Sequence, residues 1–244
     1  MIEALDLVKH FGSVRAVDGV TFTACEGEVL GLLGPNGAGK TTTLRLLATV
    51  LRPTRGTARV DGHDVRRDPA ACRAALGVLP ESWGLYGRLT PREHLRYFGR
   101  LHGLSGDDLE RRIESVVQAL EMQDFADRRC EPFSKGMKQK VALGRALIHN
   151  PRHLLLDEPT AGLDVMSARS VRELIAHLRD EGRCVILSTH ILSEAERLCD
   201  RLAVIDRGRI VAVGTPAELL QQTGQASLEE AFVRLVGVAE EGEA

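Results

Sequence analysis

Residues Gly34 to Thr41 have the spacing G-x-x-x-x-G-K-[ST], which is typical of a loop that binds phosphate. An apolar run precedes this phosphate loop (residues 34–41) and a helical pattern follows it, as the motif requires. Its glycines let backbone N–H groups turn toward an anion, Lys40 can reach the β- and γ-phosphates, and the Thr41 hydroxyl can ligate Mg²⁺. The alternative is a plain glycine turn between strand and helix, which the complete motif and its flanks disfavour. Nucleoside triphosphate binding is therefore predicted for Gly34, Pro35, Asn36, Gly37, Ala38, Gly39, Lys40, Thr41 and Thr42.

Two carboxylates close a second apolar run, in the sequence HLLLDEPTAGLD that begins at His153. A buried strand should not end in Asp157 and Glu158 unless something cationic or catalytic meets them, because an unpaired buried charge is costly. Beside the phosphate loop, Asp157 is expected to hold Mg²⁺ through its water shell. Glu158 is expected to orient and polarise the attacking water. The alternative is a polar strand end that enters a turn at Pro159.

A third apolar run, CVILSTH, ends in Ser188, Thr189 and His190. Taken alone, His190 would be an ordinary histidine at a strand end. Open α/β sheets bind ligands at the carboxyl ends of their strands, so these polar strand ends are expected to lie at one edge. There, we expect His190 to sense the γ-phosphate.

The elements that position these residues follow from the spacing of apolar residues. Residues 1–65 read as short strands with one helix after the phosphate loop, and residues 69–150 read mostly as helix. From residue 153 onward, apolar runs alternate with helical patterns, which indicates buried strands joined by helices. The sequence therefore predicts an α/β fold around a mainly parallel sheet.

Composition narrows the class of protein. A chain of 244 residues, 43% hydrophobic and 27% charged, suits one large domain or two small ones. Its 32 basic and 34 acidic residues give a formal net charge of −2, so no nucleic-acid partner is expected. The 5 cysteines form no C-x-x-C pair, which disfavours disulfides or zinc and fits a reducing cytosol. No run approaches the roughly 18 apolar residues of a membrane span, so at a membrane another chain is expected to do the spanning.

The stretch FSKGMKQK, residues 133–140, combines a hydroxyl, a glycine and three lysines ahead of an apolar pattern. The start of a surface helix would account for it without any function. A functional explanation is a second phosphate-binding site. Ser134 offers a hydroxyl, Gly136 offers a closely approaching N–H, and the helix that opens near Met137 offers a positive dipole end.

The phosphate loop, FSKGMKQK, LLLDEPTAGLD and LSTH occur in an order and at spacings that resemble the ATP-binding subunits of ABC transporters, over nearly the whole chain. The resemblance implies a P-loop NTPase core with a mainly parallel sheet, an N-terminal antiparallel β subdomain and a helical subdomain. It implies a single ABC ATPase domain over 1–244. Its expected parts are a nucleotide-binding core at about 1–80 and 150–225, a helical subdomain at 81–149, and a C-terminal helix with an acidic tail at 226–244.

The same resemblance assigns roles to residues that carry a weak signal alone. Phe11 falls where the family has an adenine-stacking aromatic, Ser134 and Gly136 fall in the signature motif, and Asp164 falls in the loop after the catalytic glutamate. In this family, two subunits pair head to tail and each presents its signature to the other's nucleotide. The resemblance thus implies ATP and Mg²⁺ as ligands and an ATP-induced dimer, a homodimer by expectation. The expected catalytic groups are Glu158, His190 and Lys40.

Three positions depart from the family's commonest form. Lys135 replaces a glycine and Met137 a glutamine in the signature motif, and Lys135 either adds a cation near the γ-phosphate or faces solvent. Glu81 stands where most relatives have a glutamine that reaches Mg²⁺ and the water, so Glu81 is expected as a metal ligand. Within the family, the chain most resembles the ATPase subunits of two-component exporters of sodium or drugs. This resemblance is carried by Glu81 and by the stretches GLYGRLT, YFGRLHGL and SLEEAFVRLVG.

Such subunits work with a separate membrane permease, so the expected location is the cytoplasmic face of the cell membrane. A soluble ABC ATPase of DNA repair or ribosome work is the main alternative, although it usually has two cassettes or a long coiled coil, and this chain has one cassette and no heptad run. A P-loop kinase or GTPase is a further alternative, against which FSKGMKQK and DEPTAGLD argue. The transported substrate is not encoded here, because its path belongs to the permease.

Overall fold

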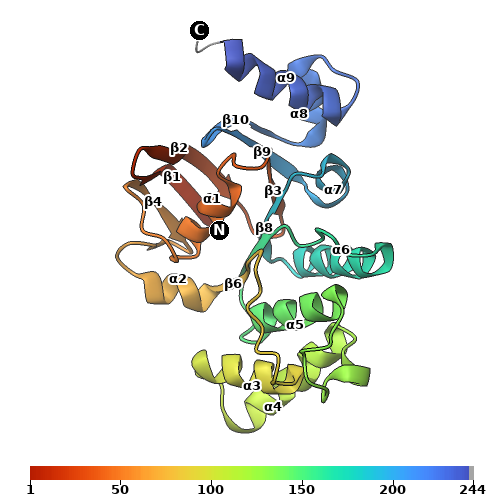
Figure 1. Ribbon diagram of the computed structural model, residues 1–244. Helices are drawn as coiled ribbons and strands as arrows, with labels where there is room; N and C mark the ends of the chain where they lie inside the picture. The colour runs from red at the N-terminus through yellow and green to blue at the C-terminus, as the bar shows by residue number, and fades with distance from the viewer. Residues whose placement is uncertain (242–244) are drawn as a thin grey trace.

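The computed structural model describes residues 1–241 of the chain, with side-chain surroundings through residue 237. Figure 1 shows an N-terminal sheet beside a longer central sheet, a group of helices below the central sheet and the C-terminal helices above it. These layers of sheet and helix match the α/β fold expected from the sequence. The end of the expected acidic tail, residues 242–244, lies outside the described residues.

Sheet A is antiparallel, and its four strands follow the order β2-β1-β4-β5. Asp61 and Gly62 form the turn between its last two strands, with φ values of 49° and 81°. Two-residue hairpin turns of this kind need a positive φ at both positions, which Asp-Gly supplies with little strain. The strands are β1 (Ile2–Phe11), β2 (Val14–Ala24), β4 (Arg55–Val60) and β5 (His63–Asp64).

Sheet B has six strands in the order β10-β9-β3-β8-β7-β6. Strands β9, β3, β8, β7 and β6 run parallel, and β10 is antiparallel to β9 at one edge. This is the mainly parallel sheet that the sequence predicted, and its parallel strands bring their carboxyl ends to one edge. The strands are β3 (Val29–Leu33), β6 (Leu76–Leu79), β7 (His153–Asp157), β8 (Cys184–Thr189), β9 (Arg201–Asp206) and β10 (Arg209–Gly214).

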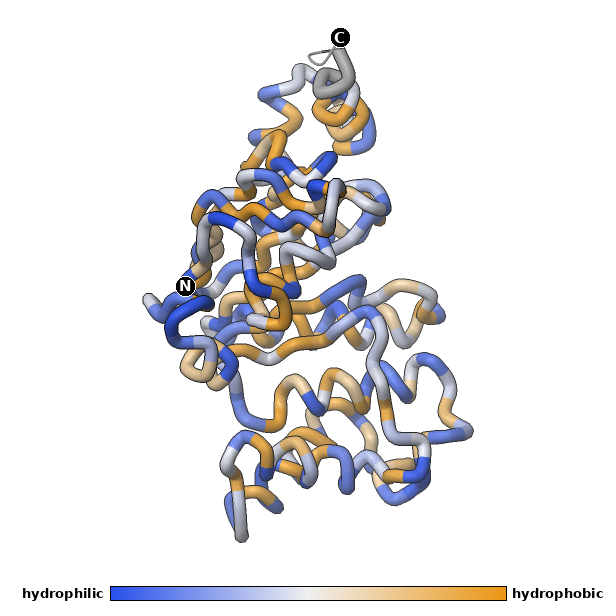
Figure 2. The backbone as a smooth tube through the Cα atoms, turned by 60° about the vertical axis from the view of Figure 1, so that its left-hand side comes forward, coloured by the Kyte–Doolittle hydropathy of each residue, from blue (hydrophilic) through white to orange (hydrophobic). Residues whose placement is uncertain are grey.

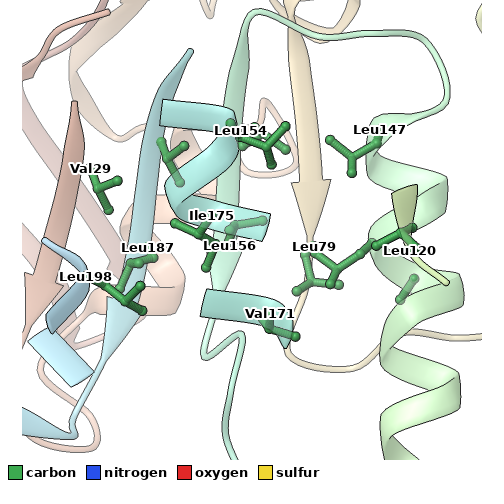
Figure 3. Close-up of a cluster of buried hydrophobic side chains, with 14 of the residues drawn as sticks. Val29, Leu79, Leu120, Leu147, Leu154, Leu156, Val171, Ile175, Leu187 and Leu198 are labelled. Atoms are coloured by element: carbon green, nitrogen blue, oxygen red, sulfur yellow. The ribbon is translucent and has the colours of Figure 1, made fainter. Parts of the chain in front are cut away.

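Both faces of sheet B are buried, and alternate residues of one strand reach different cores. Leu154 and Leu156 of β7 lie in one cluster, together with Ile175, as Figure 3 shows. Leu155 belongs to the other cluster, which also contains Leu44. Continuous apolar runs such as HLLLD are therefore needed, since successive side chains point to opposite faces. Figure 2 shows hydrophobic stretches along the interior strands and hydrophilic stretches in the outer loops.

The helices cover the sheets and extend the chain away from them. Helices α3, α4 and α5 pack on one another between β6 and β7 in the sequence and form the lower group in Figure 1. Their treatment as a separate subdomain over 81–149 stays a prediction. In the part of the chain that the structure describes, no helix has both the length and the apolar character to cross a bilayer. The helices are α1 (Lys40–Leu47), α2 (Pro69–Ala75), α3 (Pro91–Leu101), α4 (Gly106–Ala119), α5 (Lys135–Leu147), α6 (Val165–Asp180), α7 (Leu192–Leu198), α8 (Pro216–Thr223) and α9 (Leu228–Glu241), with a 3₁₀ turn at Gln123–Phe125.

Candidate active site

The phosphate loop joins β3 to α1, and two of its glycines are required for different reasons. Gly39, the residue before α1, has a left-handed φ of 105°, which side chains rarely adopt. Gly34 lies so close to the backbone carbonyl of Ile205 that a Cβ atom there would collide with it. The φ of Gly39 shapes the turn into α1, and the close approach of Gly34 allows the loop to pack against β9. Each glycine therefore fits a backbone position that a residue with a side chain would not fit.

Lys40 lies deep in the site, with a side chain that is 6% exposed. Its ammonium donates hydrogen bonds to the carbonyl oxygens of Gly34 at 2.8 Å and Pro35 at 3.2 Å. The same nitrogen lies 3.6 Å from the Oε1 atom of Glu158. A buried ammonium needs such acceptors because desolvation penalises an unpaired charge. The contacts hold one positive charge between the phosphate loop and the end of β7.

Asp157 meets two hydroxyl groups at the end of β7. Its Oδ1 atom accepts a hydrogen bond from Thr41 at 3.1 Å and another from Ser188 at 2.5 Å. A carboxylate beside a threonine hydroxyl supplies hard oxygen ligands, which suit Mg²⁺ when waters and substrate phosphates complete its shell. Residues 1–241 contain no cluster of three or more His, Cys, Asp or Glu that could hold a metal unaided. The donor set thus fits a metal that arrives with a phosphate ligand.

Glu158 occupies a strained backbone position directly after Asp157. Its φ is 49°, and its N–H donates to the Oγ atom of Ser188 at 3.0 Å. The Oε1 atom lies 2.9 Å from Nδ1 of His190, and the side chain is 12% exposed. The carboxylate is thus placed between the Lys40 ammonium and the His190 ring. An oxygen held in this way can accept a proton from a water molecule at the phosphate loop.

Part of the phosphate loop and Glu158 line a cavity of about 320 Å³, whereas Asp157 and His190 lie outside its lining. The structure therefore brings the phosphate loop and the end of β7 together, with the exposed Glu81 at the rim. The lining residues are Ala16, Asn36, Gly37, Gly39, Lys40, Thr41, Thr42, Glu81 and Glu158.

Four residues that the resemblance implicated lie away from this lining. Phe11 is 47% exposed, with the Lys9 ammonium 5.1 Å from its ring centre, so it is not a core residue. Ser134 caps α5 by accepting a hydrogen bond from the N–H of Met137 at 3.2 Å. The other two residues, Gly136 and Asp164, meet near the start of α6.

Gly136 and Asp164 both contact Ser167. A Cβ atom at Gly136 would lie 2.5 Å from the Oγ atom of Ser167, so the start of α5 approaches α6 more closely than any side chain allows. Asp164 caps α6 by accepting hydrogen bonds from the N–H groups of Met166 and Ser167, each at 3.0 Å. The Ser167 hydroxyl also donates to Asp164 at 2.7 Å, and these bonds hold the pKa of Asp164 below its usual value.

A family model described as ABC transporter matches residues 17–161, more than half of the chain. The chain belongs to the ABC transporter family. The ATP-binding protein NatA of Bacillus subtilis (strain 168) is 43% identical over 238 residues, which cover 96% of this chain and 97% of NatA. The daunorubicin/doxorubicin resistance ATP-binding protein DrrA of Streptomyces peucetius is 42% identical over 223 residues, covering 91% and 68% of the two chains.

Solved structures agree with this membership. The structure of an ATP-binding subunit of an ABC transporter has a TM-score of 0.88 and 34% identity, and the match covers 96% of this chain and 99% of that one. A dimeric ATP-binding cassette, MJ0796 in a post-hydrolysis state with ADP and Pi, has a TM-score of 0.80 and 25% identity, over 88% and 98%. The expected fold class is confirmed, and the protein is an ATPase subunit of an ABC transporter.

Two contributions to the site of this ABC ATPase were not assigned from the sequence. Ser188 bridges the end of β7, because it donates to Asp157 and accepts from the N–H of Glu158. The run CVILSTH marked Ser188 as a polar strand end, and the parallel register that pairs Asp157 with Ser188 gives it its role. Ala16 lines the cavity from β2, and no local pattern in the sequence marks it.

Proposed function

We propose that this subunit hydrolyses ATP in a head-to-tail dimer and thereby powers a membrane exporter. The observation that carries the proposal is the placement of the Glu158 carboxylate, 3.6 Å from the Lys40 ammonium and 2.9 Å from the His190 ring. A carboxylate poised at a phosphate loop suits a base for an attacking water, and a buried ammonium suits the β- and γ-phosphates.

Each residue of the site has a distinct task in this proposal. The phosphate loop binds the triphosphate through its N–H groups, and Lys40 neutralises part of its charge. Thr41 and Asp157 would hold Mg²⁺, with Glu81 at the rim, and the metal would offset phosphate charge. Glu158 orients the water and accepts its proton, while His190 fixes the Glu158 carboxylate and contacts the γ-phosphate.

The second half of the site comes from a partner subunit. Ser134 and Asp164 cap the starts of α5 and α6, outside the lining of the chain's own cavity, and with Gly136 they are assigned to another chain's nucleotide, as the resemblance implies. Ser134 is exposed, and its oxygen accepts the capping bond, so its hydroxyl hydrogen can still donate to a phosphate. The same pairing would bring Asp164 to the dimer interface. Phe11 would stack on the adenine of its own subunit.

A separate permease would carry the substrate, with this subunit at the cytoplasmic face of the membrane. The proposal of export depends on the similarity to NatA and to the drug-resistance protein DrrA over most of this chain. Glu81 lines the cavity, and the loop that follows it, up to Tyr86 and Arg88, would lie toward the permease. The dimeric relative MJ0796 supports pairing of two such cassettes.

The substitution Glu158→Gln tests this function. It removes the proton acceptor but keeps the side-chain shape, so ATP should bind, persist and trap two subunits as a dimer. Size-exclusion chromatography with ATP and Mg²⁺ measures the dimer, and chromatography without nucleotide should show mainly monomer. Glu173→Gln is the matched control, because Glu173 is exposed and pairs with Arg169 on α6. A Glu158→Gln variant that hydrolyses ATP at the wild-type rate, or that stays monomeric with ATP, would overturn the proposal.

A further inference from the structure

The backbone of Glu158 needs support from its surroundings. A left-handed φ of 49° is unusual for a residue with a side chain and persists only where neighbouring groups hold it. Ser188 supplies one support by accepting the Glu158 N–H at 3.0 Å. A second support is the Nε2 atom of Gln139, which donates to the carbonyl of Pro159 at 2.5 Å. Both act on the backbone next to the reactive carboxylate.

A third support is a side-chain contact between Thr160 and Glu194. Thr160 is 7% exposed, and its hydroxyl donates to the Oε2 atom of Glu194 in a short hydrogen bond. The other carboxylate oxygen of Glu194 accepts from Arg172 of α6 at 2.9 Å. The side chains of Glu194 and Arg172 are 13% and 21% exposed, so this ion pair is largely shielded from water. Arg172 thus fixes the carboxylate that holds Thr160.

This contact lies beside the one between Glu158 and His190. Thr160 follows Glu158 in the loop after β7, and Glu194 follows His190 at the start of α7. The same two segments are therefore joined twice: through Glu158 and His190 at 2.9 Å, and through Thr160 and Glu194. The first contact changes whenever the Glu158 carboxylate takes a proton from water. The second does not involve the reacting atoms and can keep the segments in register during that step.

We propose that Thr160 and Glu194 are positioning residues, which hold the turn at Glu158 so that its carboxylate stays between Lys40 and His190. This inference rests on the proposed role of Glu158. Neither Thr160 nor Glu194 lines the cavity, so their loss should leave nucleotide binding intact. Their loss should lower the rate of hydrolysis, because a displacement of a reacting group by about 1 Å can reduce a rate by up to about hundredfold.

Thr160→Val is the main test, because it replaces the hydroxyl with a methyl group of similar shape. We expect kcat for ATP hydrolysis to fall about tenfold, with the Kd for ADP and one bound nucleotide per chain unchanged. Thr160→Ser should restore kcat, since serine can donate the same hydrogen bond. Glu194→Gln should stay within about twofold of wild type, because an amide can accept from Arg172 and donate to the Thr160 oxygen.

Thr223→Val provides a matched control. Thr223 is 5% exposed, and its hydroxyl donates to the carbonyl of Leu219 at 2.7 Å in α8. Its replacement by valine therefore also removes a buried threonine hydroxyl, but one that lies outside the site. This control should reduce thermal stability without changing kcat. Wild-type kcat in Thr160→Val would overturn the inference, and so would a parallel loss of ADP stoichiometry, which indicates unfolding. An inactive Glu194→Gln would also overturn it by assigning the carboxylate a chemical role.

The same assays separate this inference from the proposed function. If Glu158→Gln is inactive while Thr160→Val is fully active, only the positioning role fails. If Glu158→Gln is fully active, the function on which the role rests fails as well.

Discussion

The phosphate loop and the signature segment (residues 133–140) both lead into a helix, but they satisfy their polar groups in opposite ways. Lys40, at the start of α1, is buried and lies near three oxygen atoms of its own chain. Lys135, at the start of α5, is exposed, and within the described residues its ammonium has no hydrogen-bond or ion-pair partner. One region is complete within the subunit, whereas the other exposes a hydroxyl and a charge that no acid neutralises among the described residues.

The inward side of the signature segment is firmly attached. Gly136 packs against Ser167, the Lys135 side chain lies over Gly162, and Gln139 donates to the carbonyl of Pro159. All of these contacts reach the segment that follows Glu158. In the proposed dimer, the segment that meets the partner's nucleotide is thus attached to the loop after this subunit's own Glu158.

The largest effect on ATP turnover is expected from substitution of the buried Lys40. Lys40→Ala removes the ammonium that would meet the β- and γ-phosphates and leaves Glu158 without its neighbouring charge. We expect ATP binding to weaken and turnover to fall at least about hundredfold. Lys140→Ala is the control, since the Lys140 ammonium lies 3.2 Å from Glu121, away from the cavity. Full ATPase activity in Lys40→Ala would contradict the proposal that the phosphate loop binds the triphosphate through Lys40.

The second effect tests the outward side of the signature segment. Ser134→Arg places bulk and charge in the proposed interface, so in the Glu158→Gln background it should abolish the ATP-dependent dimer while each monomer still binds ATP. Ser134→Ala is the matched variant, because both substitutions lose the cap of α5, which is worth about 1 kcal/mol. Light scattering with ATP compares them. An ATP-dependent dimer of Ser134→Arg would contradict the placement of Ser134 in the interface. A monomer that no longer binds ATP would contradict the claim that the phosphate loop binds ATP without the signature segment.

The sequence predicted the regions that are encoded locally. A glycine loop after an apolar strand identifies Lys40 and Thr41, and a carboxylate pair at a strand end identifies Asp157 and Glu158, because strand, loop and helix follow each other directly. Parallel strands with a shared carboxyl edge then predict that His190 lies nearby, and the structure places it against Glu158.

Contacts between distant segments could not be predicted in the same way. The pairing of Thr160 with Glu194 depends on how α7 packs beside the loop after β7, and the placement of Lys135 over Gly162 depends on the approach of α5 to that loop. Neither follows from a repeating pattern or a motif. Ser188 was visible as a polar strand end, yet its two bonds at the end of β7 follow only from the register between β7 and β8.

A smaller effect concerns the rim of the cavity. Glu81 lines the cavity with Thr41 and Glu158, where an ionised carboxylate adds negative charge beside the triphosphate. Glu81→Gln should keep ATPase activity and lower the Mg²⁺ concentration needed for ATP binding by about fivefold, the effect of one partly solvated charge. A Mg²⁺ titration of ATP binding measures this. Identical curves would exclude a metal-related role for Glu81, and a higher requirement would show that Glu81 is a direct ligand.

The smallest expected effect concerns the charge of Lys135. It tests whether the signature segment contributes a positive charge toward nucleotide, as the phosphate loop does through Lys40. Lys135 has no acid to neutralise it in the part of the chain that is described, whereas Lys140 on the same helix pairs with Glu121. In the Glu158→Gln background, Lys135→Met should raise the ATP concentration for half-maximal dimer formation about threefold, as expected for one exposed charge. Lys135→Arg should restore it, and Lys140→Met should leave it unchanged.

Salt separates a charge effect from a packing effect at Lys135. At about 0.5 M salt, charges interact over only a few ångströms, so the difference between Lys135→Met and wild type should shrink toward zero if the ammonium acts at a distance on the partner's phosphates. A difference that persists at high salt would instead assign the effect to the packing of the Lys135 side chain over Gly162. Equal midpoints at low salt would leave Lys135 as a solvated side chain and would make the phosphate loop the only one of the two regions that brings a lysine to the nucleotide.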